Sequence, residues 1–184
     1  INLLFKIQKI KKKKIKNFEG KNYKIRIYKN DILFKEAKLF CDWYAKKYVS
    51  KKKLSTLSNE INKQIKFLLS NLKFKNDTFT HRDFHVSNLI RYKKKLAIID
   101  TQDALIGNKA YDLVSLIDDV RFKSNNKLKN NIYNYYLKLN KKKINKLILL
   151  NDFEILSVIR NMKIIGIFAR LATRDKKSKY LKLI

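Results

Sequence analysis

The central segment of the chain reads His81-Arg82-Asp83-Phe84-His85-Val86-Ser87-Asn88. Further on, Asp100 ends the short apolar run Leu96-Ala97-Ile98-Ile99. Two carboxylates and one amide therefore stand at fixed spacings around a pattern typical of a strand. Carboxylate and amide oxygens are hard ligands that suit Mg²⁺, which keeps its other positions for water and phosphate. The spacing predicts a tight loop that carries Asp83 and Asn88, with a strand returning beside it to deliver Asp100.

The same spacing, H-x-D-x-x-x-x-N with a later strand-terminal Asp, is used by kinase-type enzymes for phosphoryl transfer. In that arrangement Asp83 accepts the proton of the attacking hydroxyl, while Asn88 and Asp100 hold Mg²⁺ against the phosphates of ATP. An H-x-D triplet alone is a weak signal, because single Asp or Asn residues in a Lys- and Asn-rich chain are usually solvated loop residues. The full spacing, the apolar strand and a helix beginning near Ala110 favour the catalytic interpretation.

Composition limits the class of protein. At 184 residues, 45% of them hydrophobic, the chain is long enough for one domain with a buried core. It contains no apolar run of about 18 residues, so no membrane span is expected. The single cysteine, Cys41, cannot form an internal disulfide and is typical of a reducing compartment, so we expect a cytoplasmic location.

The net charge of +30 raises the possibility of a nucleic-acid-binding protein. However, only seven of the 45 basic residues are Arg, the residue best suited to bidentate recognition of bases and phosphates. We interpret the lysines as a solvated surface and expect any binding of nucleic acid to be non-specific. A non-catalytic basic module for RNA or anionic surfaces is kept as the alternative hypothesis.

Acidic residues gather in one stretch of this basic chain. Residues 100–119 contain five Asp and a single Lys, a local charge of −4: Asp100, Asp103, Asp112, Asp118, Asp119 and Lys109. Neighbouring carboxylates repel one another unless a cation or hydrogen bonds compensate. The stretch therefore adds an independent indication of a metal site.

Apolar residues recur at helical spacing in most of the chain, which predicts a mostly helical α+β fold. The predicted helices cover residues 3–10, 34–49, 58–71, 110–120, 126–139 and 152–172, with Ser58 as an N-cap and the last helix buried on nearly all sides. Lys11–Lys14 is interpreted as a solvated helix end, residues 17–30 as a loop with a short strand, and Lys141–Lys143 as a charged connector. Residues 88–100 read as a β-hairpin that turns at Lys93–Lys95.

Several stretches, taken together, resemble the aminoglycoside phosphotransferase/choline kinase family, and within it the bacterial kinases that phosphorylate N-acetylmuramate and N-acetylglucosamine at the anomeric position. They are residues 40–44, 81–90, 99–104, 110–116 and 166–171. The resemblance implies the helical C-lobe of the protein-kinase-like fold, with a small β-hairpin carrying the catalytic and metal residues. It also implies ATP as phosphoryl donor, Mg²⁺ as cofactor and an amino sugar of cell-wall recycling as substrate.

By position within the family motifs, the resemblance makes Asp83 the catalytic base and Asn88 and Asp100 the Mg²⁺ ligands. His81, His85 and Asp112 become structural supports of the site. Outside residues 100–119 and 152–154 the chain offers little acid, which favours a neutral or anionic sugar over a cationic aminoglycoside.

The chain departs from the family pattern in several places. Thr101 replaces an aromatic residue and Ser87 replaces an acid. Gly20 is the only glycine before the catalytic loop, so no Gly-rich phosphate loop and no other nucleotide-clamp residue is found. We therefore expect residues 1–184 to form one aminoglycoside phosphotransferase-type domain that lacks its N-lobe, normally part of the same chain, and that has a truncated C-terminus. Alone, such a chain is expected to be inactive.

Overall fold

The computed structural model describes residues 1–11, 14–16, 18–140 and 144–184. Lys12 and Lys13 of the predicted helix end, and the whole connector Lys141–Lys143, lie outside these described residues. The chain divides into two compact units, each described here by itself. Unit 1 comprises Ile1–Lys29 and Lys73–Phe153, and unit 2 comprises Asn30–Leu72 and Glu154–Ile184. The mostly helical α+β class predicted from the sequence is confirmed.

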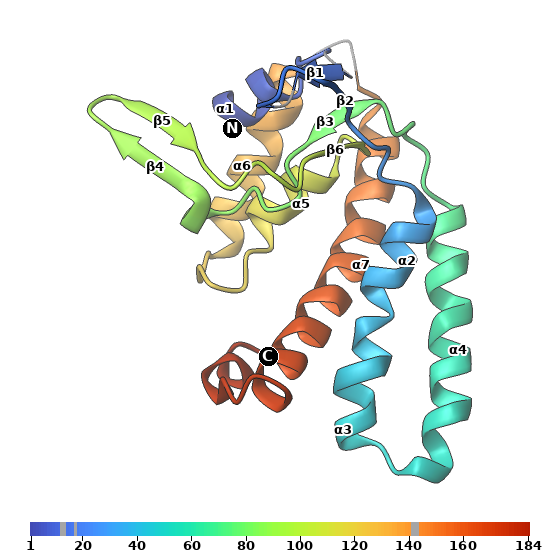
Figure 1. The fold of residues 1–184 in the computed structure, drawn as a ribbon. Helices are drawn as coiled ribbons and strands as arrows, with labels where there is room; N and C mark the ends of the chain where they lie inside the picture. Colours follow the sequence, from blue (N-terminus) through green and yellow to red (C-terminus); the bar gives the residue numbers. More distant parts are fainter. Residues whose placement is uncertain (12–13, 17, 141–143) are drawn as a thin grey trace. The chain divides into compact units, whose positions relative to one another are not determined.

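Unit 1 combines short helices with three antiparallel strand pairs among its described residues (Figure 1). The strands are β1 (Lys14–Lys16), β2 (Asn22–Lys24), β3 (Thr78–Thr80), β4 (Leu89–Tyr92), β5 (Lys95–Ile98) and β6 (Leu105–Gly107), paired as β1–β2, β3–β6 and β4–β5. Its helices are α1 (Asn2–Ile7), the 3-10 turn η2 (Val86–Asn88), α5 (Tyr111–Ile117), α6 (Asn126–Leu139) and the first turns of α7 (Lys146–Thr173).

The pair β3–β6 forms the base from which the central loop emerges. Thr78 lies opposite Gly107 in the register, and residues 26–28 join the other side of β6 through hydrogen bonds from Tyr28 N to Ile106 O at 2.8 Å and from Ile106 N to Arg26 O at 2.9 Å. A Cβ at Gly107 would lie 2.9 Å from Thr80 Oγ1 and 3.2 Å from Tyr28 Cβ. Glycine thus allows three backbone segments to meet directly before the loop begins.

The predicted hairpin is present as β4–β5, with Leu89 opposite Ile98 and Tyr92 opposite Lys95, so Lys95 begins β5 and does not belong to the turn as predicted. Its turn is tight, and Lys93 adopts a left-handed backbone with φ 53°. Several of its apolar side chains are exposed, among them Ile90, Tyr92, Leu96 and Ile99.

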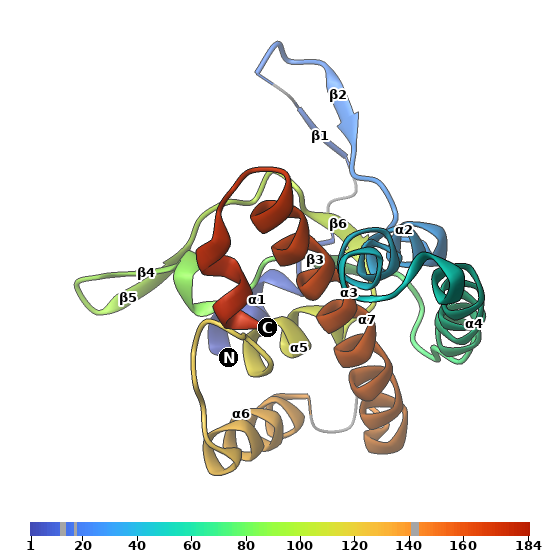
Figure 2. The same ribbon diagram turned by 90° about the horizontal axis from the view of Figure 1, so that it is seen from below.

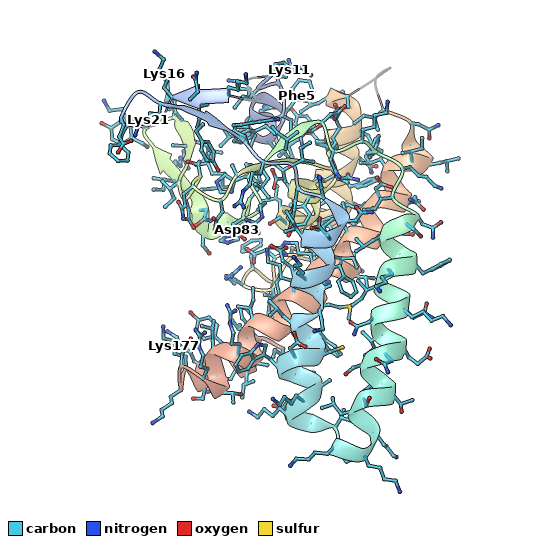
Figure 3. All side chains as sticks on the ribbon, turned by 45° about the vertical axis from the view of Figure 1, so that its right-hand side comes forward. Phe5, Lys11, Lys16, Lys21, Asp83 and Lys177 are labelled. Carbon is cyan, nitrogen blue, oxygen red and sulfur yellow. The ribbon has the colours of Figure 1, made fainter. Side chains whose placement is uncertain are left out.

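The hairpin β1–β2 was not predicted in this form. The first helix ends at Ile7, and Lys14 begins a strand whose register pairs it with Lys24. Every residue of the two strands is exposed, so no alternation of apolar and polar residues marks them in the sequence. Figure 2 shows this hairpin extending away from the other elements of unit 1, and Figure 3 labels Lys16 and Lys21 on it.

The core of unit 1 gathers around α5 and Tyr136 of α6. Leu113, Val114 and Ile117 of α5 are all buried, and α5 ends at Ile117 rather than at residue 120 as predicted. The bounds predicted for α6 are confirmed, and on this helix Tyr135 is 42% exposed, whereas Tyr136 is fully buried. A hydrogen bond from the Tyr136 hydroxyl to Gln8 Oε1, at 2.7 Å, accounts for the difference by fixing the helix to α1.

Unit 2 is helical in its described residues. A nearly continuous helical segment runs through α2 (Asn30–Ala37), the π-helix η1 (Phe40–Ala45) and α3 (Lys46–Tyr48), and α4 (Lys51–Ser70) returns beside it (Figure 1). The later part of α7 and the 3-10 segment η3 (Ser178–Leu183) complete the unit. The predicted N-cap Ser58 was wrong, because α4 already begins at Lys51 after Ser50. Ser58 instead lies inside α4 and hydrogen-bonds Cys41.

Helix α7 carries a buried face but is not buried on all sides as predicted, since Val158 is 47% exposed. At Gly166 its backbone lies directly against Leu39. A Cβ at Gly166 would lie 2.5 Å from the Leu39 carbonyl oxygen and 2.6 Å from the Leu39 Cβ. None of the helices described here is both long enough and apolar enough to cross a membrane.

Candidate active site

The loop after β3 is held by one buried carboxylate. Asp112, in the first turn of α5, accepts the backbone amide of His81 on Oδ2 at 2.7 Å and that of Arg82 on Oδ1 at 2.9 Å. Hydrogen bonds to a charged group are stronger than neutral ones, at about 1.5–3 kcal/mol each. They compensate the left-handed backbone of Arg82, whose φ is 76°. The loop is therefore fixed immediately before Asp83.

The side chain of Arg82 supports the same loop from the other side. Its Nη1 donates to Asp103 O at 3.1 Å, and its guanidinium lies 5.0 Å from the centre of the Tyr28 ring. Tyr28 in turn packs edge-on against Tyr111, and its hydroxyl donates a hydrogen bond to the hydroxyl oxygen of Tyr111 at 3.1 Å. Sequence reasoning missed Arg82, Tyr28 and Tyr111, because only the fold brings residues so far apart in the chain together.

His81 connects the loop to the end of the hairpin. Its Nε2 lies 3.0 Å from the carbonyl oxygen of Ile99, the residue before Asp100. The ring is buried and meets Phe84 edge-on. His85 is also buried, and its backbone amide donates to Asp83 O at 3.0 Å. Both histidines are thus buried beside the loop.

Asn88 occupies the junction between the loop and the hairpin. Its Nδ2 donates to Asp83 O at 3.0 Å, which leaves Oδ1 as the side-chain atom able to bind a cation. Its carbonyl oxygen accepts the amide of Ile99 at 3.1 Å. Asn88 is therefore bonded to Asp83 on one side and to the neighbour of Asp100 on the other.

Asp100 follows β5 with a left-handed backbone, at φ 66°, and is exposed. Gln102 Nε2 donates a hydrogen bond to its Oδ1. Asp83 is half-buried, and its carboxylate has no hydrogen bond or ion pair with any residue that the structure describes. Figure 3 marks Asp83 in the loop. A carboxylate with no such partner in the described chain can accept a proton from an incoming hydroxyl.

The donor set at the base of the hairpin suits Mg²⁺. It offers one amide oxygen, on Asn88, and one carboxylate, on Asp100, and Mg²⁺ is usually bound by one or two protein ligands together with phosphate oxygens and water. Within the described residues no three His, Cys, Asp or Glu side chains gather into a group able to hold a metal. Any metal held here would need phosphate oxygens or water to complete its shell.

The acidic stretch 100–119 does not form the metal site that its charge suggested. Both carboxylate oxygens of Asp112 accept hydrogen bonds from backbone amides. Asp118 forms an ion pair with Lys129 at 3.1 Å, and Asp119 forms one with Arg121 at 3.3 Å. The prediction of a metal site from this cluster was wrong for Asp112, Asp118 and Asp119, because amides and cations of the chain itself compensate their charges.

A second buried carboxylate, Asp152, was not identified as a structural residue from the sequence. It accepts the amides of Lys73 and Phe74, each at 2.8 Å, and the side-chain amides of Asn151 at 2.9 Å and Asn108 at 2.6 Å. Asp152 is fully buried, and it connects the start of α7 to the segment before β3. Its only sequence signal is an acid within an apolar helix pattern.

The sequence profile described as "Phosphotransferase enzyme family" matches residues 28–143. An N-acetylmuramate/N-acetylglucosamine kinase of Neisseria meningitidis serogroup B is 30% identical over 158 residues, which cover 83% of this chain and 47% of that protein. A Caulobacter vibrioides protein of the same name is 32% identical over 111 residues, covering 58% of this chain and 30% of that protein. A Pseudomonas aeruginosa protein of the same name is 29% identical, covering 84% and 47%. The chain spans about half the length, or less, of these curated relatives.

Proposed function

Because this chain belongs to the phosphotransferase enzyme family, we propose that it supplies the catalytic base and the metal ligands of an ATP- and Mg²⁺-dependent kinase that phosphorylates an amino sugar. The substrate class is taken from the names of the relatives. One observation carries the proposal: Asn88 is hydrogen-bonded to Asp83 O and also to the amide of Ile99, next to Asp100. Three groups required for phosphoryl transfer thus belong to one hydrogen-bonded segment.

In the proposed reaction Asp83 orients the acceptor hydroxyl and takes its proton. Asn88, through Oδ1, and Asp100 hold the metal, which when bound neutralises charge on the transferred phosphoryl group. Asp112, His81 and Arg82 keep the loop in place. Such positioning matters because phosphoryl transfer depends on orientation and electrostatics more than on covalent catalysis.

Both units are proposed to belong to one aminoglycoside phosphotransferase-type domain, the helical lobe of the fold. The family profile covers residues of each unit, and α7 contributes residues to each.

The catalytic assignment is tested in a chimera that adds to this chain the part of the Neisseria meningitidis relative that it does not span. ADP release is measured with N-acetylmuramate and N-acetylglucosamine as acceptors. Asp83→Asn and Asp100→Asn are each expected to lower kcat by about 10² to 10⁴. Asp103→Asn removes a neighbouring exposed carboxylate and is expected to leave kcat unchanged. Near-normal turnover in Asp83→Asn would remove the assignment.

The 184 residues alone are expected to transfer no phosphate and to bind Mg·ATP no more tightly than the millimolar range. The reason is that two protein ligands hold Mg²⁺ weakly and the sequence contains no Gly-rich phosphate loop. Calorimetric titration checks this expectation, and micromolar binding would contradict it.

A second candidate function rests on the charge of +30 alone: a basic module for RNA. Screening of lysine charges predicts strong binding at low salt that collapses as salt rises. Sequence preference that persists at physiological salt would favour this function over the kinase.

A further inference from the structure

One side-chain contact in unit 1 has no part in the proposed reaction so far: the amide of Gln102 donates a hydrogen bond to Oδ1 of Asp100. Asp100 is exposed, and its backbone is left-handed, with φ 66°. An exposed Asp carboxylate usually takes many orientations, because its terminal torsion is broad. The hydrogen bond from Gln102 restricts this rotation and engages one of the two carboxylate oxygens.

Gln102 is itself held in place by a β-turn. The amide of Ala104 donates to the carbonyl oxygen of Thr101 at 3.1 Å, so Gln102 and Asp103 are the two central residues of this turn. The guanidinium of Arg82 donates to the carbonyl oxygen of Asp103 at 3.1 Å. The turn that carries Gln102 is therefore attached directly to the loop after β3.

The backbone on each side of the pair Asp100 and Gln102 is also anchored within unit 1. Before the pair, the amide of Ile99 donates to the carbonyl oxygen of Asn88 at 3.1 Å. After it, Leu105 begins the buried strand β6, which pairs with β3. The hydrogen bond from Gln102 thus orients the carboxylate against a backbone that is already fixed.

The oxygens of three carboxylates around the loop are engaged to different degrees. Both oxygens of Asp112 accept backbone amides, whereas neither oxygen of Asp83 bonds to a described residue. Asp100 is intermediate: Oδ1 accepts the Gln102 amide, and Oδ2 has no hydrogen bond or ion pair with any residue that the structure describes. A carboxylate oriented through one oxygen still offers the other oxygen to a cation.

Gln102 is a neutral donor in a chain that has 45 basic and 15 acidic residues. Asp118 and Asp119 each form an ion pair with a basic side chain. Within the part of the chain that the structure describes, Asp100 forms none. A lysine or arginine bonded to Asp100 would cancel the charge that attracts a cation, whereas an amide orients the carboxylate and leaves its charge available.

We propose that Gln102 is a positioning residue of the metal site, which orients the Asp100 carboxylate through Oδ1 and leaves Oδ2 as the metal ligand. The inference rests on the proposed function, because it concerns a Mg²⁺ ligand named there. Carboxylates that bind metals are usually hydrogen-bonded themselves, and loss of such a partner typically lowers metal affinity or activity about 10- to 100-fold. Without the partner, the side chain must be ordered when the metal binds.

Metal binding to the 184-residue chain gives a readout that does not depend on turnover. Mn²⁺ shares the oxygen ligands and octahedral geometry of Mg²⁺, and as a paramagnetic ion it broadens the amide NMR signals of nearby residues. The broadening of the Asn88 and Asp100 signals is followed as Mn²⁺ is added. Asp100→Asn is expected to abolish this local broadening.

Gln102→Leu keeps a side chain of similar size and removes the donor. It is expected to weaken Mn²⁺ binding about tenfold. Thr101→Val is the matched control, because it changes a neighbouring side chain of the same turn that forms no hydrogen bond with a described residue. It is expected to leave the Mn²⁺ affinity unchanged. The amide signals of residues 105–107 show whether each variant keeps the fold of β6.

The chimera separates positioning from a merely structural role. At a fixed, saturating ATP concentration, Gln102→Leu is expected to raise the Mg²⁺ concentration for half-maximal turnover about tenfold. Its kcat at saturating Mg²⁺ is expected to stay within about twofold of that of the unaltered chimera. A merely structural role would lower kcat at every Mg²⁺ concentration. Asp83→Asn is not expected to recover at high Mg²⁺, because it lacks the base.

Equal Mn²⁺ affinities in the unaltered chain and Gln102→Leu would overturn the inference. A loss of kcat in the Gln102→Leu chimera that persists at saturating Mg²⁺ would do the same. If Asp100→Asn abolishes the broadening while Gln102→Leu leaves it unchanged, only the role of Gln102 falls and the proposed metal site stands. If neither Asp83→Asn nor Asp100→Asn lowers turnover, the proposed function falls, and the role of Gln102 falls with it.

Discussion

The Asp112 carboxylate receives two successive backbone amides, one on each oxygen, and is 1% exposed. Asp112→Asn places an NH₂ group against one of these amides, so one hydrogen bond is lost and two donors meet. We expect the free energy of unfolding to fall by about 1–3 kcal/mol. Urea denaturation measures the loss.

Asp83→Asn serves as the matched control, because the same substitution there changes a half-buried carboxylate whose oxygens bond to no described residue. Its expected effect on the free energy of unfolding is below about 0.5 kcal/mol. Equal losses in the two variants would contradict the bracing role of Asp112.

Tyr136 couples stability to alkaline pH. Burial raises the pKa of its hydroxyl, an effect only partly offset by the hydrogen bond to Gln8. Below the ordinary tyrosine pKa of about 10, the hydroxyl is neutral in both the folded and the unfolded chain, and its contribution to stability is fully present. Above that value only the unfolded chain loses the proton, so the contribution falls as pH rises.

Tyr136→Phe is therefore expected to be less stable than the unaltered chain by about 1 kcal/mol near neutral pH, through loss of one hydrogen bond. The difference should shrink above pH of about 10, because phenylalanine does not ionise. Denaturant unfolding of both proteins at neutral and alkaline pH measures it. A difference that widens with pH would contradict the argument.

The approach of α7 to η1 depends on Gly166. In a helix interior, Gly→Ala normally stabilises by about 1 kcal/mol. Here the added Cβ would meet the backbone of Leu39, which cannot rotate away as a side chain does. Overpacking of this kind costs about 1–3 kcal/mol, so we expect Gly166→Ala to destabilise. It should also shift Trp43 emission, because η1 follows Leu39 directly.

Thermal unfolding and Trp43 emission measure these effects. Val158→Ala, at an exposed position of the same helix, is the control and is expected to change neither by much. A Gly166→Ala variant more stable than the unaltered chain would show that the higher helix propensity of alanine outweighs the overlap of its Cβ with Leu39.

Elements with a clear period were predictable from the sequence. Residues 126–139 and the hairpin β4–β5 follow helical and alternating patterns, and both were found within a residue or two of their predicted bounds. Strand β6 is three residues long and fully buried, so it has no alternation to detect. The π-helix has no local pattern that predicts it, and Gly166, whose backbone lies against Leu39 at its start, is far along the chain.

Some residues of the candidate site could likewise be predicted from the sequence, and others could not. Asp83, Asn88 and Asp100 could be predicted from their spacing, since one loop and one hairpin carry them, and their roles remain our proposal. Arg82 over Tyr28 and Asp152 beneath Lys73 are contacts between distant segments. Such pairs are fixed by tertiary packing, which a single sequence does not display.

The molecule as a whole carries a net charge of +30. Its lysines are closer together in the folded state than in the unfolded state, so their mutual repulsion destabilises the folded state. Salt shortens the range of this repulsion to about 10 Å at 0.1 M. We expect Tm to rise between low and moderate NaCl concentrations. A variant with Lys51, Lys52 and Lys53 changed to Glu should show a smaller rise. A falling Tm in the unaltered chain would contradict this account.

The hydrogen bonds to Asp152 make local opening of the chain measurable. The chain enters unit 1 at Lys73 and leaves it after Phe153, and the Asp152 carboxylate accepts the amides of both Lys73 and Phe74. Hydrogen-bonded amides exchange their hydrogen for solvent deuterium when the bond opens. The deuterium uptake of these two amides therefore measures how often the segment at Lys73 and Phe74 separates from Asp152 of α7.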